Sequence, residues 1–259
     1  MNNLPVRSVP RNSPDTPLTH KRETHWPEVI MFSFLAVAFG FFEYIMQARI
    51  YSAGQAGIWI LIRTASFTGA TLIGFALLSS VIFRLFPRTA RFWRARRYLG
   101  VWGVLYVYTH IIFVYIYYKF DLSQIYSTLN PFDNPKVFGL IAAPIFLAMA
   151  LTSSDWAMDV LTPRRWKFLH RFVYVAYLAS VFHFISVNPS ALVSVPGALL
   201  LIVTVLTIIG HTYLFFRIAI RKRFRSVGSI VGLIIISSAL VIGWKVYLDS
   251  VAPFLKSLD

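Results

Sequence analysis

Seven apolar stretches separated by short polar loops decide what this chain can fold into. Several of them approach or exceed the roughly 20 apolar residues that a helix needs to cross a bilayer. Only 14% of the 259 residues are charged, against about a quarter in a soluble domain. We therefore predict an all-α fold, a polytopic transmembrane helical bundle of six to seven spans. The expected spans are residues 28–48, 57–86, 98–118, 137–154, 166–187, 195–216 and 227–246.

The positive charge of the chain alternates between the loops. Arginine and lysine are frequent in the N-terminal segment and after the second, fourth and sixth spans, and sparse in the loops between. Positive residues favour cytoplasmic loops, so a net charge of +15 indicates topology and argues against nucleic-acid binding. We predict a cytoplasmic N-terminus and a C-terminus on the outer side of the membrane. The proline-rich residues 1–27 are expected to form a disordered cytoplasmic tail, 28–248 the bundle, and 249–259 a short C-terminal tail.

Two absences restrict the redox chemistry. The chain has no cysteine, which excludes disulfides, thiolate ligands and iron–sulfur clusters. It also lacks a G-x-G-x-x-G nucleotide fingerprint and a soluble extension large enough for a flavin domain. Any nicotinamide or flavin chemistry is therefore expected from another protein.

Three histidines lie inside apolar spans, where an ionisable side chain is costly and usually functional. His110 lies about 18 Å into the third span, and His183 lies roughly 25 Å into the fifth, counted from Tyr98 and Trp166 at 1.5 Å per residue. Helix tilt can absorb that difference. Two histidines are a common axial pair for electron-transfer haem. His110 and His183 are thus predicted to ligate one haem b.

His170 suggests a second, inner haem. It lies about 20 Å from His183 along the same span, with the two side chains roughly 140° apart around a straight helix. Either this span is kinked or rotated, or the two histidines face different neighbours. His211 in the sixth span lies at a similar depth to His170, so a haem between them is possible. The alternative is that His211 hydrogen-bonds a neighbouring helix.

Charged residues near these histidines have two interpretations each. Arg171 and Arg97 are candidates to bind haem propionates, because arginine pairs with carboxylates bidentately. Ordinary topology or lipid headgroup binding explains them as well. Glu43 is expected to pair with Arg49 or Arg63, or else to take part in proton movement.

The residues from about 68 to 184 resemble the ferric-reductase-like transmembrane domain. Within that group they are most similar to the haem-binding membrane subunit of the bacterial periplasmic methionine sulfoxide reductase system. The stretches that carry the resemblance are 96–100 (RRYLG) with Trp102, 108–110 (YTH), Gly139, 147–153 (LAMALTS), 166–174 (WKFLHRFVY) and His183.

The resemblance implies a b-type haem protein with its core at about 57–190 and with His110, His170 and His183 as the functional histidines. It implies electron flow from a cytosolic flavin reductase or the quinone pool to a periplasmic molybdopterin reductase. FMN or quinone is a further candidate cofactor. The polar tail, the seventh span and His211 depart from the subfamily pattern. The alternatives are a ferric or other metal reductase without a protein acceptor, and a non-redox transporter or assembly factor.

Overall fold

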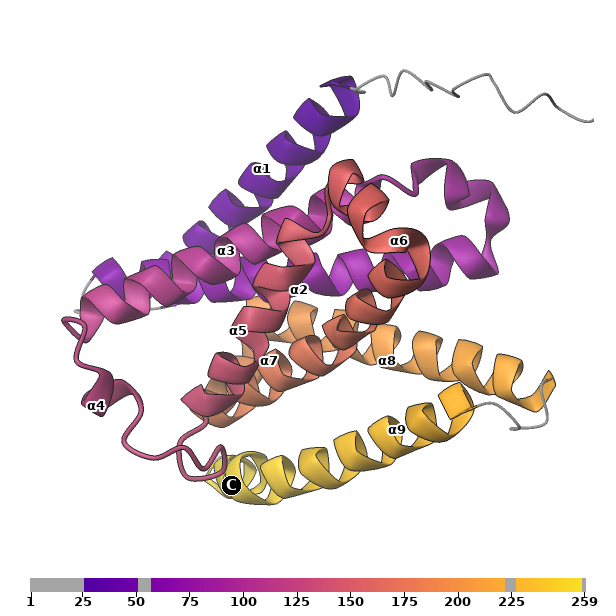
Figure 1. Ribbon diagram of the computed structural model, residues 1–259. Coiled ribbons are helices and arrows are strands. Elements are labelled where there is room, and N and C mark those ends of the chain that lie inside the picture. The colour runs from indigo at the N-terminus through magenta and orange to yellow at the C-terminus, as the bar shows by residue number, and fades with distance from the viewer. Residues whose placement is uncertain (1–25, 51–56, 222–226, 258–259) are drawn as a thin grey trace, which may run out of the picture.

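The fold is all-helical over the residues described in a computed structural model, which are 26–50, 57–221 and 227–257 (Figure 1). Each of the seven predicted apolar stretches contains a helix. These helices are α1 (Trp26–Ile50), α2 (Gly57–Leu85), α3 (Ala95–Tyr117), α5 (Lys136–Leu151), α7 (Val173–Val187), α8 (Val195–Arg221) and α9 (Val227–Val246). Shorter elements are η1 (Pro87–Phe92), α4 (Leu122–Ile125), α6 (Asp155–Leu169), η2 (His170–Phe172), η3 (Pro189–Val193), η4 (Tyr247–Val251) and α10 (Ala252–Lys256).

Six helical stretches of the described residues are long and apolar enough to cross a membrane, when Asp155–Val187 and Ile236–Lys256 are each taken as one stretch. The predicted fold class is therefore confirmed, and the protein is a multi-pass membrane protein. The fourth apolar helix, α5, has 16 residues and is about 24 Å long, shorter than the hydrocarbon core of about 30 Å. The predicted N-terminal tail lies outside the described residues except for its last two. Most of the predicted C-terminal tail is helical, since η4 and α10 extend to Lys256.

The second helix, α2, lies at the centre of the bundle and packs against α1, α3, α7 and α8. Its approach to α3 is close because glycines face each other. A Cβ added to Gly69 would lie 2.9 Å from the backbone nitrogen of Val107, and one added to Gly103 would lie 3.0 Å from the carbonyl oxygen of Gly69. Small residues of this kind let two membrane helices pack backbone to backbone.

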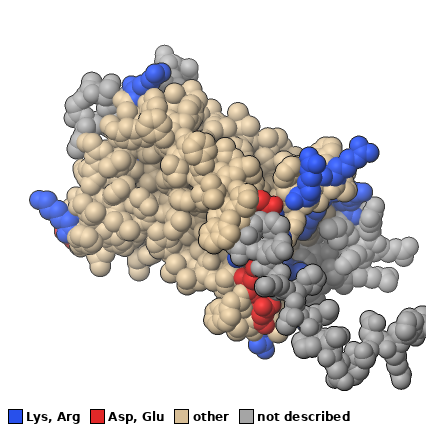
Figure 2. Space-filling model, turned by 90° about the horizontal axis from the view of Figure 1, so that it is seen from above, with Lys and Arg blue, Asp and Glu red and all other residues tan. Residues whose placement is uncertain are grey.

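The bundle has two ends that differ in charge. We call them the α6 end, toward the right of Figure 1, and the α4 end, toward the left. Figure 2 shows a broad uncharged surface with most of its Lys and Arg toward the α6 end. The basic residues of the α2–α3 connection and of α6 account for this, namely Arg84, Arg88, Arg91, Arg94, Arg96, Arg97, Arg164, Arg165 and Lys167. The alternation of charge predicted from the loops is therefore also an asymmetry of the folded bundle.

The fifth predicted span is broken at His170. Helix α6 begins at Asp155 and is interrupted at Thr162, whose positive φ of 62° precedes Pro163. A 3₁₀ turn at His170–Phe172 then leads into α7. His170 thus lies in the 3₁₀ turn and His183 in α7, and the two face different neighbours, His170 next to Trp166 and His183 next to His110. The start of this span was predicted wrongly, at residue 166, because α6 is too polar to resemble a membrane helix.

Candidate haem site

The rings of His110 and His183 face each other between α3 and α7. Their centroids are 6.3 Å apart and their planes are inclined by 65°. Residues 73 positions apart in the chain thus meet at one depth, as the comparison of helix depths predicted. The proximity of α3 and α5, and of α5 and α7, brings the two histidines together.

Each of the two rings is held from behind by a backbone carbonyl. His110 Nδ1 lies 3.0 Å from the carbonyl oxygen of Ile62 in α2. His183 Nδ1 lies 3.0 Å from the carbonyl oxygen of Pro135, directly before α5. A carbonyl oxygen only accepts, so each Nδ1 carries the proton and donates it. The lone pair of each Nε2 is then the one available to a metal, which is the arrangement that second-shell hydrogen bonds impose on ligating histidines.

The spacing of the rings fits two axial ligands on one metal ion. An imidazole nitrogen binds a transition metal at about 2 Å, and the ring centre lies about 1 Å beyond it, so two opposed rings have centres about 6 Å apart. Among the described residues no group of three or more His, Cys, Asp or Glu could hold a metal by itself. A pair of imidazoles suits an iron whose other four ligands come from a porphyrin.

The surroundings of the pair are apolar and closely packed. A Cβ added to Gly139 of α5 would lie 3.7 Å from the His183 ring, so the helix backbone packs against that ring. Phe184, next in the chain, makes an edge-to-face contact with Phe67 of α2 at 5.0 Å. Both histidines are partly buried, and these contacts cover one side of His183.

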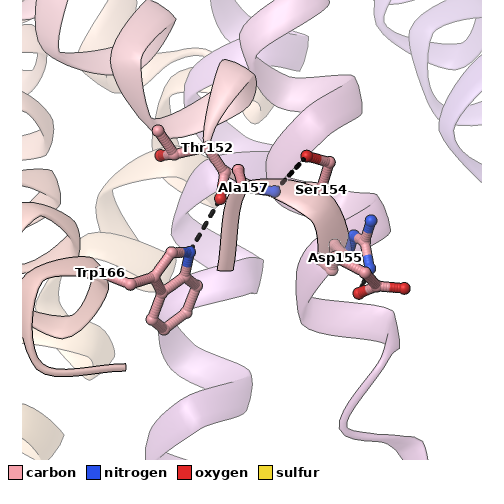
Figure 3. A network of polar contacts seen from close by, with 6 residues as sticks. Thr152, Ser154, Asp155, Ala157 and Trp166 are labelled. Atoms are coloured by element: carbon pink, nitrogen blue, oxygen red, sulfur yellow. Dashed lines mark hydrogen bonds and ion pairs between the residues drawn. The ribbon is translucent and has the colours of Figure 1, made fainter. Parts of the chain in front are cut away.

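His170 lies at the α6 end, in the corner between α5 and α6. Its ring stacks on Trp166 at 3.9 Å, and its Nε2 lies 3.3 Å from the Thr152 hydroxyl. Figure 3 shows Trp166 directing its Nε1–H at the carbonyl oxygen of Thr152, at 2.8 Å, while the hydroxyl of Ser154 accepts from the Ala157 N–H at 3.1 Å. This network holds His170 near the surface of the bundle.

His211 is engaged at both ring nitrogens. Its Nε2 lies 3.2 Å from the carbonyl oxygen of Leu77, to which it donates, and its Nδ1 lies 3.4 Å from the Tyr174 hydroxyl, from which it accepts. His170 and His211 make no ring contact with each other within the described part of the chain. His211 is therefore hydrogen-bonded to neighbouring helices, which is the alternative to haem ligation considered above. Ligation of an inner haem by His170 and His211 stays a prediction.

The arginines proposed for propionates lie at the α6 end. Arg97 donates to the Asp155 carboxylate at 2.8 Å and joins α3 to α6. Arg171 is exposed, so the structure does not place it in a buried ion pair. The pairing expected for Glu43 was wrong, because both of its carboxyl oxygens are buried without a hydrogen-bond partner.

Sequence reasoning missed the groups that orient the histidines. The carbonyls of Ile62 and Pro135, the hydroxyl of Thr152 and the phenol of Tyr174 all bond to a candidate histidine. Backbone carbonyls occur at every position and give no sequence signal. The two side chains do fall within or next to the stretches that carry the family resemblance, and that was the only available signal.

Comparison with known proteins shows first which protein family the chain resembles and then which individual proteins are similar to it. Residues 65–181 match the family described as ferric reductase like transmembrane component, so this part of the chain is similar to a ferric-reductase-like transmembrane domain. More particularly, the chain is distantly similar to the protein-methionine-sulfoxide reductase heme-binding subunit MsrQ of two Brucella species. It is 27% identical to the Brucella anthropi protein over 155 residues, which are 58% of this chain and 69% of that protein. It is 33% identical to the Brucella ovis protein over 95 residues, 36% of this chain.

These comparisons confirm the resemblance inferred from the sequence and support haem binding in general. The match spans only 41% of the length of the Brucella ovis protein. His110 and His170 lie within the family match, and His183 lies two residues beyond its end.

Proposed function

We propose that this chain is a haem b membrane protein that transfers electrons across the bacterial cytoplasmic membrane, with His110 and His183 as the axial ligands of one haem. The facing imidazoles, each with Nδ1 donating to a backbone carbonyl and Nε2 left for a metal, are the observation that carries the proposal. Bound haem supplies one-electron chemistry in such a site.

The residues of the chain would do three things for that chemistry. The carbonyls of Ile62 and Pro135 fix the tautomer and rotation of the two rings and make them better ligands. The Phe67–Phe184 contact excludes water from one side. Burial in an apolar interior and neutral ligation then set the potential, since these are the means by which a protein tunes haem.

The proposed electron donor follows from the positive charge at the α6 end, and the proposed electron acceptor follows from the names of the similar proteins. Under the predicted orientation the basic α6 end faces the cytoplasm, where it would attract an acidic flavin reductase or lie close to the quinone pool. FMN or quinone would then act as the immediate electron source. The relatives are named as the haem-binding subunit of a protein-methionine-sulfoxide reductase, so the proposed acceptor is a periplasmic reductase subunit of that type. The family match favours a second candidate, reduction of ferric iron or another metal without a protein acceptor.

An absorption spectrum of the purified protein, oxidised and dithionite-reduced, tests the haem. The expected result is a low-spin b-type spectrum that is lost or strongly weakened in His110→Ala and in His183→Ala. His211→Ala is the matched control, because both of its ring nitrogens already bond to protein and its loss is expected to leave the haem-to-protein ratio unchanged.

Two outcomes would contradict the proposal. Well-folded, colourless protein from haem-replete cells would remove the redox function. A haem-to-protein ratio near two that falls by half in both His170→Ala and His211→Ala would show an inner haem and correct the stoichiometry. Co-purification with a periplasmic reductase subunit would separate the two candidate acceptors.

A further inference from the structure

A cluster of unpaired polar side chains lies between α1 and α2. The buried side-chain nitrogen and oxygen atoms that lack a hydrogen-bond partner in the described chain all belong to five residues, Glu43, Gln47, Thr64, Thr68 and Thr71. Glu43, Thr68 and Thr71 are 0% exposed, Gln47 is 1% exposed and Thr64 is 8% exposed. The family match begins at residue 65, so α1 and its two polar residues lie outside it.

The spacing of these residues places them on facing sides of the two helices. Glu43 and Gln47 are four residues apart, so they lie on one face of α1, and the three threonines follow the i, i+4, i+7 pattern of one face of α2. Phe39 of α1 contacts Phe75 of α2 edge-to-face at 6.4 Å. Since α1 and α2 run antiparallel, counting from that contact brings Glu43 level with Thr71, and Gln47 level with Thr68.

The neighbouring elements leave this cluster without a fixed charge. On α3, the phenol of Tyr106 lies 3.4 Å from the carbonyl oxygen of Ala36, nearer the start of α1. On α8, Thr204 and Thr207 direct their hydroxyls at the carbonyls of Leu200 and Gly74. Besides Glu43, the charged residues of the two helices are Glu28 and Arg49 on α1 and Arg63 and Arg84 on α2. None of them forms a hydrogen bond with Glu43.

Five groups of this kind are costly unless they bind something polar. A buried group without a hydrogen bond loses its full desolvation energy, and the loss is larger at the depth of a membrane. Buried waters in proteins typically make about three hydrogen bonds to such groups. An ionised carboxylate without a partner costs far more than the neutral acid, which favours a proton on Glu43.

We propose that α1 and α2 enclose an internal water-binding site in which the carboxyl group of Glu43 carries an exchangeable proton. The neutral acid, the carboxamide of Gln47 and the three hydroxyls each both donate and accept hydrogen bonds, as bound water requires. A cation would instead need Glu43 to be ionised. The site is separate from the histidine pair and does not depend on haem, although Thr64 follows Ile62, the partner of His110, by two residues.

Infrared spectroscopy of the purified full-length protein at pH 8 tests this site. Subtracting the spectrum of Glu43→Gln from that of the wild type is expected to leave the C=O stretch of one protonated carboxylic acid, which moves to lower frequency in D₂O. Glu28→Gln is the control, because Glu28 lies on the same helix but is partly exposed, 3.6 Å from Arg94. Its difference spectrum is expected to contain only ionised carboxylate bands.

A difference spectrum for Glu43→Gln with carboxylate bands alone would overturn the proposal, and so would an acid band that D₂O leaves unmoved. Should Glu43→Gln fail to fold, Thr68→Val provides the second variant. Removing that hydroxyl is expected to keep the acid band and shift its frequency, because one hydrogen-bond partner of the site is lost. An unshifted band in folded Thr68→Val would count against a shared site.

Discussion

The imidazoles of His110 and His183 are oriented by main-chain carbonyls, so their positions depend on backbone packing. The Pro135 carbonyl that holds His183 lies directly before α5, and Gly139 of that helix packs against the ring. A side chain at position 139 therefore acts on His183 without touching its hydrogen bond directly.

Substitution of Gly139 is expected to give a graded loss of haem. Gly139→Ala places its Cβ about 3.7 Å from the ring, an ordinary contact, and is expected to keep the wild-type spectrum. Gly139→Leu must displace the ring of His183 and is expected to reduce haem content several-fold, because overpacking shifts neighbouring groups. The haem-to-protein absorbance ratio of the two purified variants checks this. Equal haem content in both would show that α5 does not support the ring.

At the residue scale, the sequence predicted the His110–His183 pair but not the surroundings of Glu43. Counting residues along each span was enough to pair His110 with His183, although the counted stretch before His183 includes a 3₁₀ turn. The pairing of Glu43 failed because Arg63 lies about 100° around α2 from Thr64, whose face carries the unpaired hydroxyls. Arg63 is adjacent to Thr64 in the sequence but lies on a different face of α2, so it does not face Glu43.

At the scale of helices, the contact between α2 and α3 positions one half of the haem site. His110 lies two turns beyond Gly103, the residue at which the two backbones approach. The same contact brings the Ile62 carbonyl of α2 to His110 of α3.

Gly103→Ala is expected to weaken both the fold and haem binding. The added Cβ would lie 2.6 Å from the Ile73 side chain and 3.0 Å from two backbone atoms, so the helices must separate, at a cost of about 1–3 kcal/mol. Gly100→Ala is the matched control, because its nearest neighbour would be the Cβ of Ala76 at 3.8 Å. Thermal unfolding in detergent and haem content measure the difference. Indistinguishable variants would refute the close-packing argument.

The loop between α3 and α5 contains a pH-sensitive helix cap. Hydrogen bonds from the Ser123 hydroxyl, and then from the backbone N–H groups of Gln124 and Ser123, lower the pKa of Asp121 below its ordinary value. Because the folded pKa is depressed, the cap is fully effective above the ordinary pKa of about 4 and is lost as the pH falls through the folded value. Carbon-13 NMR of the Asp121 carboxyl is expected to show a titration midpoint below the ordinary value for aspartate, and the midpoint is expected to rise in Ser123→Ala. An unchanged midpoint in that variant would contradict the assigned cause.

The apolar runs of the sequence predicted the membrane helices well, whereas the polar helix α6 was not predicted from the sequence. The apolar run 227–246 is helical throughout as α9, and the helix continues through η4 and α10 to Lys256. Helix α6 was missed because charged residues and Pro163 interrupt its apolar character; the charged residues are Asp155, Asp159, Arg164, Arg165 and Lys167. Its beginning depends on the Ser154 cap and on the Arg97–Asp155 ion pair, which form only in the folded bundle.

At the scale of the whole molecule, the charge asymmetry of the two ends makes the topology testable. Positive residues gather at the α6 end, so that end is predicted to face the cytoplasm. With α5 counted as crossing, seven passages put the C-terminus in the periplasm. A C-terminal alkaline phosphatase fusion is expected to be active and a green fluorescent protein fusion dark. The reverse pattern would show that α5 does not cross or that the orientation is inverted.

The shortness of α5 has a consequence for how electrons would leave the protein. His183 lies four residues before the end of α7, about 6 Å along the axis, and its carbonyl partner Pro135 lies directly before the start of α5. Under the proposed function, charge arriving between the two rings is only one or two helical turns from the aqueous phase at the α4 end. Direct tunnelling to a partner docked there would need no intermediate relay, so the rate would depend on docking geometry more than on any further group within the bundle.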